Sequence, residues 1–326
     1  MADWQGVSDP HDRREDYEFV SWRGPGDKGA DSPDPDPAMP LPAVSFEFFP
    51  PKDLEGSFRL WDCVGVLGPL GPRFVSVTYG AGGATRDLTH EAVATIRKTS
   101  GLTVAAHLTC VDQGREETLA IADAYAEAGV TEIVALRGDP PKGAERFTPH
   151  PQGFASSVEL VEALARTGRF AIRVGAYPET HPEAADAQAD IEFLRRKVDA
   201  GATSAITQFF FRPETFFRFR DACAAAGIAV PIIPGILPIE SWKGARRFAE
   251  RCGTSIPPTV ATAFDNAERD GTTELLAVAT ATALCDRLVA GGAEHLHFYT
   301  LNRPELSRDV CLALGLRARP GLRAVA

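Results

Sequence analysis

One acidic residue stands inside an aromatic run near the start of the sequence. Glu47 lies between Phe46 and Phe48, and Phe49 follows. A carboxyl group that is buried among apolar side chains has its ionised form destabilised, so its pKa rises. We therefore expect Glu47 to hold a proton near neutral pH and to act as a general acid. A structural carboxylate in an ion pair is the other interpretation of this pattern.

Other polar residues stand at or just after the ends of apolar, β-type runs. They are Thr78, Tyr79, His107, Thr109, Arg137, Asp139, Tyr177, Glu179, Gln208, Thr300, Asn302 and Arg303. Burying such groups is unfavourable unless they have partners. A fold that brings these ends to one face would assemble the polar groups into a site.

The β-type runs alternate with helical stretches from residue 43 onwards. The eight runs are Ala43–Phe48, Phe74–Tyr79, Thr103–Cys110, Glu132–Gly138, Ala171–Tyr177, Ser204–Phe211, Pro231–Leu237 and His295–Thr300. The clearest helical stretches are Glu116–Ala128, Val158–Ala165, Ala187–Asp199, Glu214–Ala226 and Glu274–Val289. This alternation predicts a parallel α/β sheet with crossover helices. Eight repeats favour a closed (β/α)8 TIM barrel, whose active sites lie at the carboxyl ends of the strands.

The sequence divides into an N-terminal extension, a predicted barrel and a short C-terminal tail. Residues 1–42 are charged and rich in Gly and Pro, and we expect a flexible N-terminal extension, disordered or loosely docked. Its aromatic residues leave docking on the barrel or on a neighbouring subunit open. Residues 43–318 are predicted to form the catalytic barrel and residues 319–326 a C-terminal tail. The longer interval between Leu237 and His295 predicts an inserted helix or an extended loop.

The composition limits which classes of binding partner and which cellular compartment the sequence suits. The formal net charge is -10, which gives no general electrostatic attraction to nucleic acid. The six cysteines form no C-x-x-C pair, as is typical of free thiols in a reducing compartment. Neither a secretory signal nor an apolar run long enough to span a membrane is visible. These observations predict a cytoplasmic protein that binds neither nucleic acid nor membrane.

Three further motifs have plain interpretations. The run Gly80–Thr85 resembles a dinucleotide fingerprint but lacks the third glycine, so we interpret it as a βα loop near the site. His295 and His297 share a strand face, and packing explains them better than a metal, since no third ligand is near in sequence. The spacing of His181, Glu183 and Asp186 would also suit a metal, but we predict no metal site.

Nine strings, taken in order, carry a family resemblance. They are Ser45–Lys52, Phe74–Ala81, His107–Cys110, Ala135–Asp139, Ala176–Glu179, His181–Ala184, Ile206–Phe211, Pro234–Pro238 and His297–Arg303. Together they resemble the methylenetetrahydrofolate reductases of the bacterial type, which have a catalytic domain only. The resemblance extends from Ala43 to Leu316, and nearly every string lies at the end of a predicted strand.

The resemblance implies a flavin-dependent oxidoreductase that reduces 5,10-methylenetetrahydrofolate to 5-methyltetrahydrofolate and feeds methionine synthesis. Members bind FAD at the carboxyl ends of the barrel strands, and NADH or NADPH reduces the flavin. The folate then takes the place of the nicotinamide dinucleotide and receives a hydride on its methylene carbon. A homo-oligomer, such as a tetramer, is also implied. Glu47 corresponds to the general acid, and Asp139 to a carboxylate that contacts the pterin and influences the flavin.

The resemblance also assigns binding residues. The positions that match the flavin site are Thr78, Tyr79, Ala81, His107, Arg137, Gly138, Asp139, Ala155, Tyr177, His181, Ala184, Asp190, Arg196 and Lys197. Those that match the substrate site are Glu47, Asp139, Gln208, Phe248 and Arg303. Gln208 and Phe248 match residues that contact either the folate or the nicotinamide, and Arg303 matches a folate-binding arginine. Arg137, Arg196 and Lys197 would supply positive charge for the FAD pyrophosphate on an acidic protein.

Two positions depart from the family pattern. Gly244 replaces a glutamine before the stacking Phe248, and Phe193 replaces an asparagine in the helix that carries Lys197. We expect a weaker folate contact and looser FAD binding. Two other functions remain open: a one-carbon transferase without flavin, which colourless active protein would favour, and a non-catalytic folate- or flavin-binding subunit. The presence of Glu47, Asp139 and Gln208 together argues against the subunit.

Overall fold

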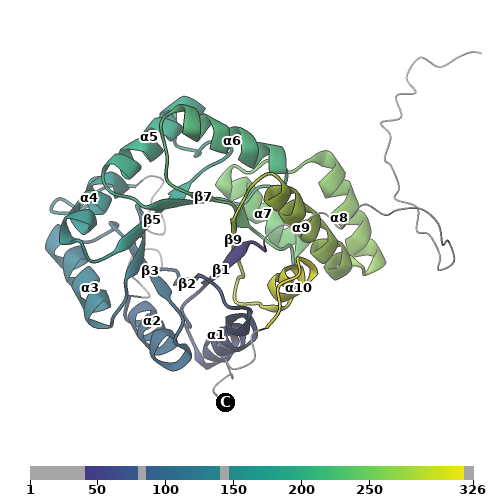
Figure 1. Ribbon diagram of the computed structural model, residues 1–326, viewed down its shortest axis with the longest axis horizontal. Helices are drawn as coiled ribbons and strands as arrows, with labels where there is room; N and C mark the ends of the chain where they lie inside the picture. The colour runs from purple at the N-terminus through teal and green to yellow at the C-terminus, as the bar shows by residue number, and fades with distance from the viewer. Residues whose placement is uncertain (1–40, 80–85, 140–146, 319–326) are drawn as a thin grey trace, which may run out of the picture. The chain divides into compact units, whose positions relative to one another are not determined.

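The computed structural model describes residues 41–79, 86–139 and 147–318 (Figure 1). The predicted N-terminal extension up to residue 40, the C-terminal tail and the loop Gly80–Thr85, which includes Ala81, lie outside these ranges. None of the helices in the described ranges combines the length and the apolar composition that a membrane crossing needs.

The strands of the described residues form one parallel sheet. They are β1 (Ala43–Phe48), β2 (Phe74–Val77), β3 (Val104–Thr109), β4 (Glu132–Leu136), β5 (Ala171–Ala176), β6 (Ser204–Thr207), β7 (Ile232–Ile233), β8 (Gly235–Ile236) and β9 (His295–Tyr299). Their order in the sheet is β7-β6-β5-β4-β3-β2-β1-β9-β8. Chain order and sheet order therefore agree, as expected when each strand is followed by a crossover to its neighbour.

The sheet closes on itself at Pro234. The predicted strand Pro231–Leu237 divides there, because proline has no N–H to continue the ladder. Its first half, β7, pairs with β6, and its second half, β8, pairs with β9. The carbonyl of Pro234 accepts a hydrogen bond of 3.0 Å from the N–H of His297 on β9. The predicted (β/α)8 barrel is confirmed, with one strand shared between its two neighbours.

Helices surround the strands (Figure 1). They are α1 (Leu54–Leu67), α2 (Arg86–Ser100), α3 (Arg115–Glu127), α4 (Ser157–Thr167), α5 (Ala187–Asp199), α6 (Pro213–Ala225), α7 (Trp242–Cys252), α8 (Pro258–Asp270), α9 (Thr273–Ala290) and α10 (Glu305–Ala313), with a short 3₁₀ helix at Gly68–Leu70. The inserted helix predicted before His295 is α8. Side-chain caps fix where α1, α5 and α7 begin: Asp53, Asp186 and Ser241 each accept a backbone N–H from the first turn.

Alternation along β1 separates an apolar face from a polar one. Phe46 and Phe48 are buried in the core between the sheet and the helices. Ser45 and Glu47 face the opposite way, into the barrel, where a smaller apolar cluster lies around Phe74. Glu47 therefore does not share the environment of its two aromatic neighbours in sequence.

One predicted strand was too long. The run Ser204–Phe211 was expected to be strand throughout, but β6 ends at Thr207. Phe209 and Phe210 are buried and Phe211 is half-buried in the loop that leads to Pro213, the first residue of α6. Their apolar character therefore reflects packing and not strand structure.

Gly235 gives a test of how tightly the barrel closes. A Cβ at this position would lie 2.6 Å from Tyr299 Cε2 and closer still to the carbonyl oxygen of Thr207, both on neighbouring strands. We predict that Gly235→Ala forces these strands apart and lowers the free energy of unfolding by about 2–4 kcal/mol. The urea midpoint measures this loss. Gly68→Ala is the control, because its Cβ would meet only Leu102 Cδ1 at 3.6 Å. Equal destabilisation by both changes would contradict the tight closure.

Candidate active site

The carboxyl group of Glu47 lies between two imidazoles inside the barrel. Its Oε2 atom is 3.4 Å from Nε2 of His107 on β3 and 3.9 Å from Nε2 of His297 on β9. The side chain is 18% exposed, and the backbone carbonyl accepts a hydrogen bond of 2.6 Å from Thr300 Oγ1. Three strands therefore converge on this one carboxyl group.

Burial shifts the pKa of each of these three groups in the direction that favours its uncharged form. Burial raises the pKa of Glu47, and the attraction of His107 opposes this only in part. Burial also lowers the pKa of His107 and brings that of His297 to about 3. Burial therefore disfavours an ion pair at these contacts, because it opposes the charged form of each partner. The expected rise in the pKa of Glu47 and its cause, burial, are confirmed. The residues expected to bury it are wrong, since Phe46 and Phe48 point out of the barrel.

A polar column continues below Glu47. Ser45 Oγ lies 2.7 Å from Nδ1 of His297 and 2.9 Å from Nε2 of His295. The ring of Phe74 stacks on His297, with 5.6 Å between the ring centroids. Both histidines thus pack and hydrogen-bond within the barrel, and no group of three or more His, Cys, Asp or Glu side chains in the described ranges is arranged to hold a metal ion.

Tyr299 and Tyr177 connect Glu47 to the other predicted site residues. Burial raises the pKa of Tyr299, and the nearby Glu47, Tyr177 and Cys252 act in the same direction. Burial raises the pKa of Tyr177 to about 12, with Cys252 and Asp139 adding to the effect and a hydrogen bond from the Gln208 side chain opposing it. Glu47, Asp139 and Gln208 therefore lie at the same end of the barrel.

Helix α7 contributes an aromatic wall to this end. The ring of Phe248 stacks on Phe209, with 5.1 Å between centroids and 25° between planes. Gln208 Nε2 lies 3.4 Å from Cys252 Sγ, so the amide side chain is held between β6 and α7. Gly244 donates its N–H to Ser241 Oγ at 3.2 Å and so completes the N-terminal cap of α7.

The predicted flavin positions on β2 to β4 occupy the same carboxyl ends. Tyr79 is buried after β2, and its hydroxyl accepts a hydrogen bond of 3.2 Å from Gln113 Nε2. The Arg137 guanidinium makes two hydrogen bonds to the Glu183 carboxylate. Gly138 has φ +90°, and a Cβ there would lie 2.9 Å from Val111 Cγ1, so only glycine suits this turn.

The remaining flavin positions lie after β5 and on α5. The rings of Tyr177 and His181 meet edge to face with centroids 4.5 Å apart, and Asp190 Oδ2 accepts the His181 N–H at 2.8 Å. Lys197 donates from Nζ to the carbonyl of Gly175 at 2.6 Å, and burial lowers its pKa to about 8. Phe193, the departure on this helix, lies under Nζ of Lys197 at 5.1 Å, a cation–π contact.

The remaining predicted residues differ in their exposure and in their partners. Arg303 forms an ion pair with Glu240 at 3.0 Å. Arg196 and Ala155 are exposed, and the Ala184 N–H bonds to the His181 carbonyl within its own turn. Thr78 is half-buried at the end of β2, and Asp139 is exposed after β4. Sequence reasoning missed Ser45, Tyr299, Cys252 and Glu240; the alternation of residues on β1 and β9 was the available signal for the first two.

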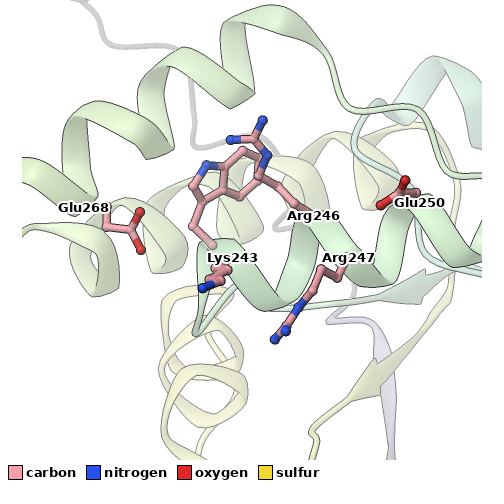
Figure 2. Close-up of a pocket in the computed structure, with 6 residues that line it drawn as sticks. Lys243, Arg246, Arg247, Glu250 and Glu268 are labelled. Atoms are coloured by element: carbon pink, nitrogen blue, oxygen red, sulfur yellow. The ribbon is translucent and has the colours of Figure 1, made fainter.

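A separate hollow of about 390 Å³ is lined by side chains of α7 and by one side chain of α8 (Figure 2). Its lining residues are Trp242, Lys243, Arg246, Arg247, Glu250 and Glu268. None of them is a predicted site residue, so the hollow and the barrel interior are different features.

Comparison with known proteins decides the family. Residues 38–315 match the family model described as methylenetetrahydrofolate reductase. The chain belongs to the methylenetetrahydrofolate reductase family. It is 48% identical over 280 residues to the 5,10-methylenetetrahydrofolate reductase of Escherichia coli (strain K12), covering 86% of this chain and 92% of that one. The Salmonella typhimurium enzyme of the same name is 47% identical over the same shares.

A plant relative and a solved structure extend the comparison. Methylenetetrahydrofolate reductase (NADH) 1 of Arabidopsis thaliana is 36% identical, over 84% of this chain and 48% of that one. An uncharacterised Clostridium thermocellum protein, described as binding two copies of 5-methyl-5,6,7,8-tetrahydrofolic acid, has a TM-score of 0.55 at 14% identity. It covers 85% of this chain and 95% of its own and supports the barrel fold.

As a member of the reductase family, the chain is an oxidoreductase that acts on methylenetetrahydrofolate, and not a one-carbon transferase or a binding subunit.

The charge state of Glu47 can be observed directly. We predict that the infrared spectrum at about pH 7 contains the C=O stretch of a protonated carboxyl group, because burial opposes ionisation. The part of the band that comes from Glu47 should vanish in Glu47→Gln, whereas a part from Glu240, whose pKa burial raises to about 7, should remain. Glu268→Gln, which removes an exposed carboxylate on α8, should leave the band in place. A wild-type spectrum without the band would show that Glu47 is ionised.

Proposed function

We propose that this reductase uses FAD, accepts electrons from NADH or NADPH, and converts 5,10-methylenetetrahydrofolate to 5-methyltetrahydrofolate with Glu47 as the general acid. The observation that carries the proposal is the raised pKa of Glu47 at the barrel end that also holds Asp139 and Gln208. A carboxyl group that keeps its proton near neutral pH can give it to a substrate nitrogen.

The residues at this end suit a large polar cofactor. His107 Nε2, Thr109 Oγ1 and Gln113 Oε1 are buried and have no hydrogen-bond partner within the described ranges. Buried polar atoms normally have partners, so these three point to a ligand that supplies them. Arg137, Arg196 and Lys197 would hold the pyrophosphate of FAD. When bound, FAD supplies the redox chemistry, taking up a hydride and passing one on.

Glu47 is well placed to release and regain a proton. The neutral imidazoles of His107 and His297 offer it no cation, so its ionised form is stabilised little once the proton has left. Transfer of the proton to a folate nitrogen assists opening of the five-membered ring. Reprotonation is then favourable, because burial again opposes the carboxylate.

The other predicted residues bind the folate and nicotinamide substrates and orient them. The Asp139 carboxylate can accept hydrogen bonds from the N–H groups of a pterin. Gln208 both donates and accepts, so it suits a nicotinamide amide as well as a folate. The Phe248 ring offers a flat apolar face to either substrate. We assign Arg303 to the folate, whose glutamate part carries carboxylates.

We also propose a cytoplasmic location. All six cysteines are free thiols, and five of them are buried. Burial raises the pKa of Cys110 to about 11 and of Cys311 to about 12, so these thiols are inert in a reducing compartment.

Colour gives the first test of the cofactor. The purified protein should be yellow, release FAD on denaturation, and lose its visible flavin absorbance when NADH or NADPH is added without oxygen. Colourless protein that still forms 5-methyltetrahydrofolate would contradict the flavin proposal.

Stopped-flow kinetics of Glu47→Gln test the acid. The variant should keep the rate of flavin reduction by NADH within about threefold, because no proton from Glu47 is needed there. Its reduction of methylenetetrahydrofolate should fall by about 10²–10⁴-fold, the usual contribution of a general acid. Glu250→Gln, on the outer side of α7, should leave both half-reactions unchanged. Equal losses in both half-reactions of Glu47→Gln would contradict the acid role.

A further inference from the structure

Glu240 and Arg303 form an ion pair whose two partners differ in exposure. Glu240 lies in the loop between β8 and α7, and Arg303 lies between β9 and α10. Arg303 Nη1 is 3.0 Å from Glu240 Oε2, and the side chains are 64% and 15% exposed, respectively. The guanidinium is therefore accessible to a ligand, whereas the carboxylate lies beneath it.

The surroundings of Glu240 disfavour its ionised form and so weaken its ion pair with Arg303. The groups that act on Glu240 are Arg303 and the carboxylate of Glu305, which begins α10. The buried Cys63 thiol of α1 also faces it, and Asp62 and Glu305 act on that thiol too. Burial raises the pKa of Glu240 to about 7, with Arg303 opposing and Glu305 adding to the rise. Near neutral pH the carboxylate is thus only partly ionised despite its cation.

We propose that Glu240 is a specificity-determining residue that holds Arg303 at the barrel mouth and releases it to a carboxylate of the folate substrate. The inference rests on the proposed function, which assigns Arg303 to folate. Glu240 and the substrate carboxylate compete for one guanidinium. Because the proposed function assigns Arg303 to the folate and not to the nicotinamide dinucleotide, Glu240 affects the folate step and not the nicotinamide step.

The movement of Arg303 from Glu240 to the substrate carboxylate also changes the protonation of Glu240. When Arg303 turns to the substrate, Glu240 loses its cation in a partly buried place, so its affinity for protons increases. It then takes up a proton from solvent, and folate binding is coupled to uptake of up to one proton. Below about pH 7 Glu240 is already protonated and Arg303 is free, so binding is tightest there. Affinity for folate therefore falls as the pH rises through about 7.

The test measures the dissociation constant of 5-methyltetrahydrofolate for the flavin-loaded enzyme at about pH 6 and about pH 8. Glu240→Gln should bind about three- to tenfold more tightly than wild type at the higher pH and about equally at the lower. Calorimetry in buffers of different ionisation enthalpy should show proton uptake by wild type and by Glu240→Asp, and none by Glu240→Gln. Glu268→Gln removes the same charge from α8 and should behave as wild type.

Different results would overturn the role of Glu240 and the proposed function. Weaker folate binding by Glu240→Gln at both pH values would show that Glu240 orients Arg303, which would overturn the inference. Unchanged binding and unchanged proton uptake would also overturn it. The rate of flavin reduction by NADH should be the same in all these variants, and a parallel change there would count against the inference. A wild-type enzyme that binds no 5-methyltetrahydrofolate would instead overturn the proposed function.

Discussion

A carboxyl group whose ionised form is disfavoured by burial is the feature on which this barrel end depends. Glu47 is inside a closed parallel sheet, and its nearest titratable neighbours, His107 and His297, are neutral. A charge on any one of the three would have no counter-ion within this group, so the interior favours the uncharged form of each. The same burial holds Ser45 and His295 in a hydrogen-bonded column below.

Much of this fold was predictable because strand and helix periods are local properties. Apolar runs that alternate with helical stretches predicted all the barrel strands. Two features of the fold could not be predicted, because they depend on contacts between segments that are far apart in the sequence. The register of β1 against β9 pairs Ser45 with His297, and nothing in the order of the residues reveals it. The strand divides at Pro234 for a local reason, but the pairing of its two halves with β6 and β9 follows from closure of the ring.

The site was predictable in part. Glu47 and Gln208 stood out because polar residues within apolar runs need a reason, and the structure brings them to one barrel end with Asp139. Adjacent aromatic residues were the wrong explanation for the pKa of Glu47, since neighbours in a strand face opposite sides. The pairing of Arg303 with Glu240 joins two loops far apart in sequence and gave no local signal. The individual roles of the flavin positions and the homo-oligomer stay predictions.

The pH dependence of a single turnover tests the central claim most directly. Enzyme with pre-reduced flavin is mixed with methylenetetrahydrofolate, and flavin reoxidation is followed across the pH range. If Glu47 supplies the proton, the rate at saturating folate is constant at low pH and falls as the pH rises through its elevated pKa. A rate that begins to fall already near the pKa of an exposed carboxyl group, about 4.3, or that does not fall at all, would contradict a protonated Glu47 as the acid.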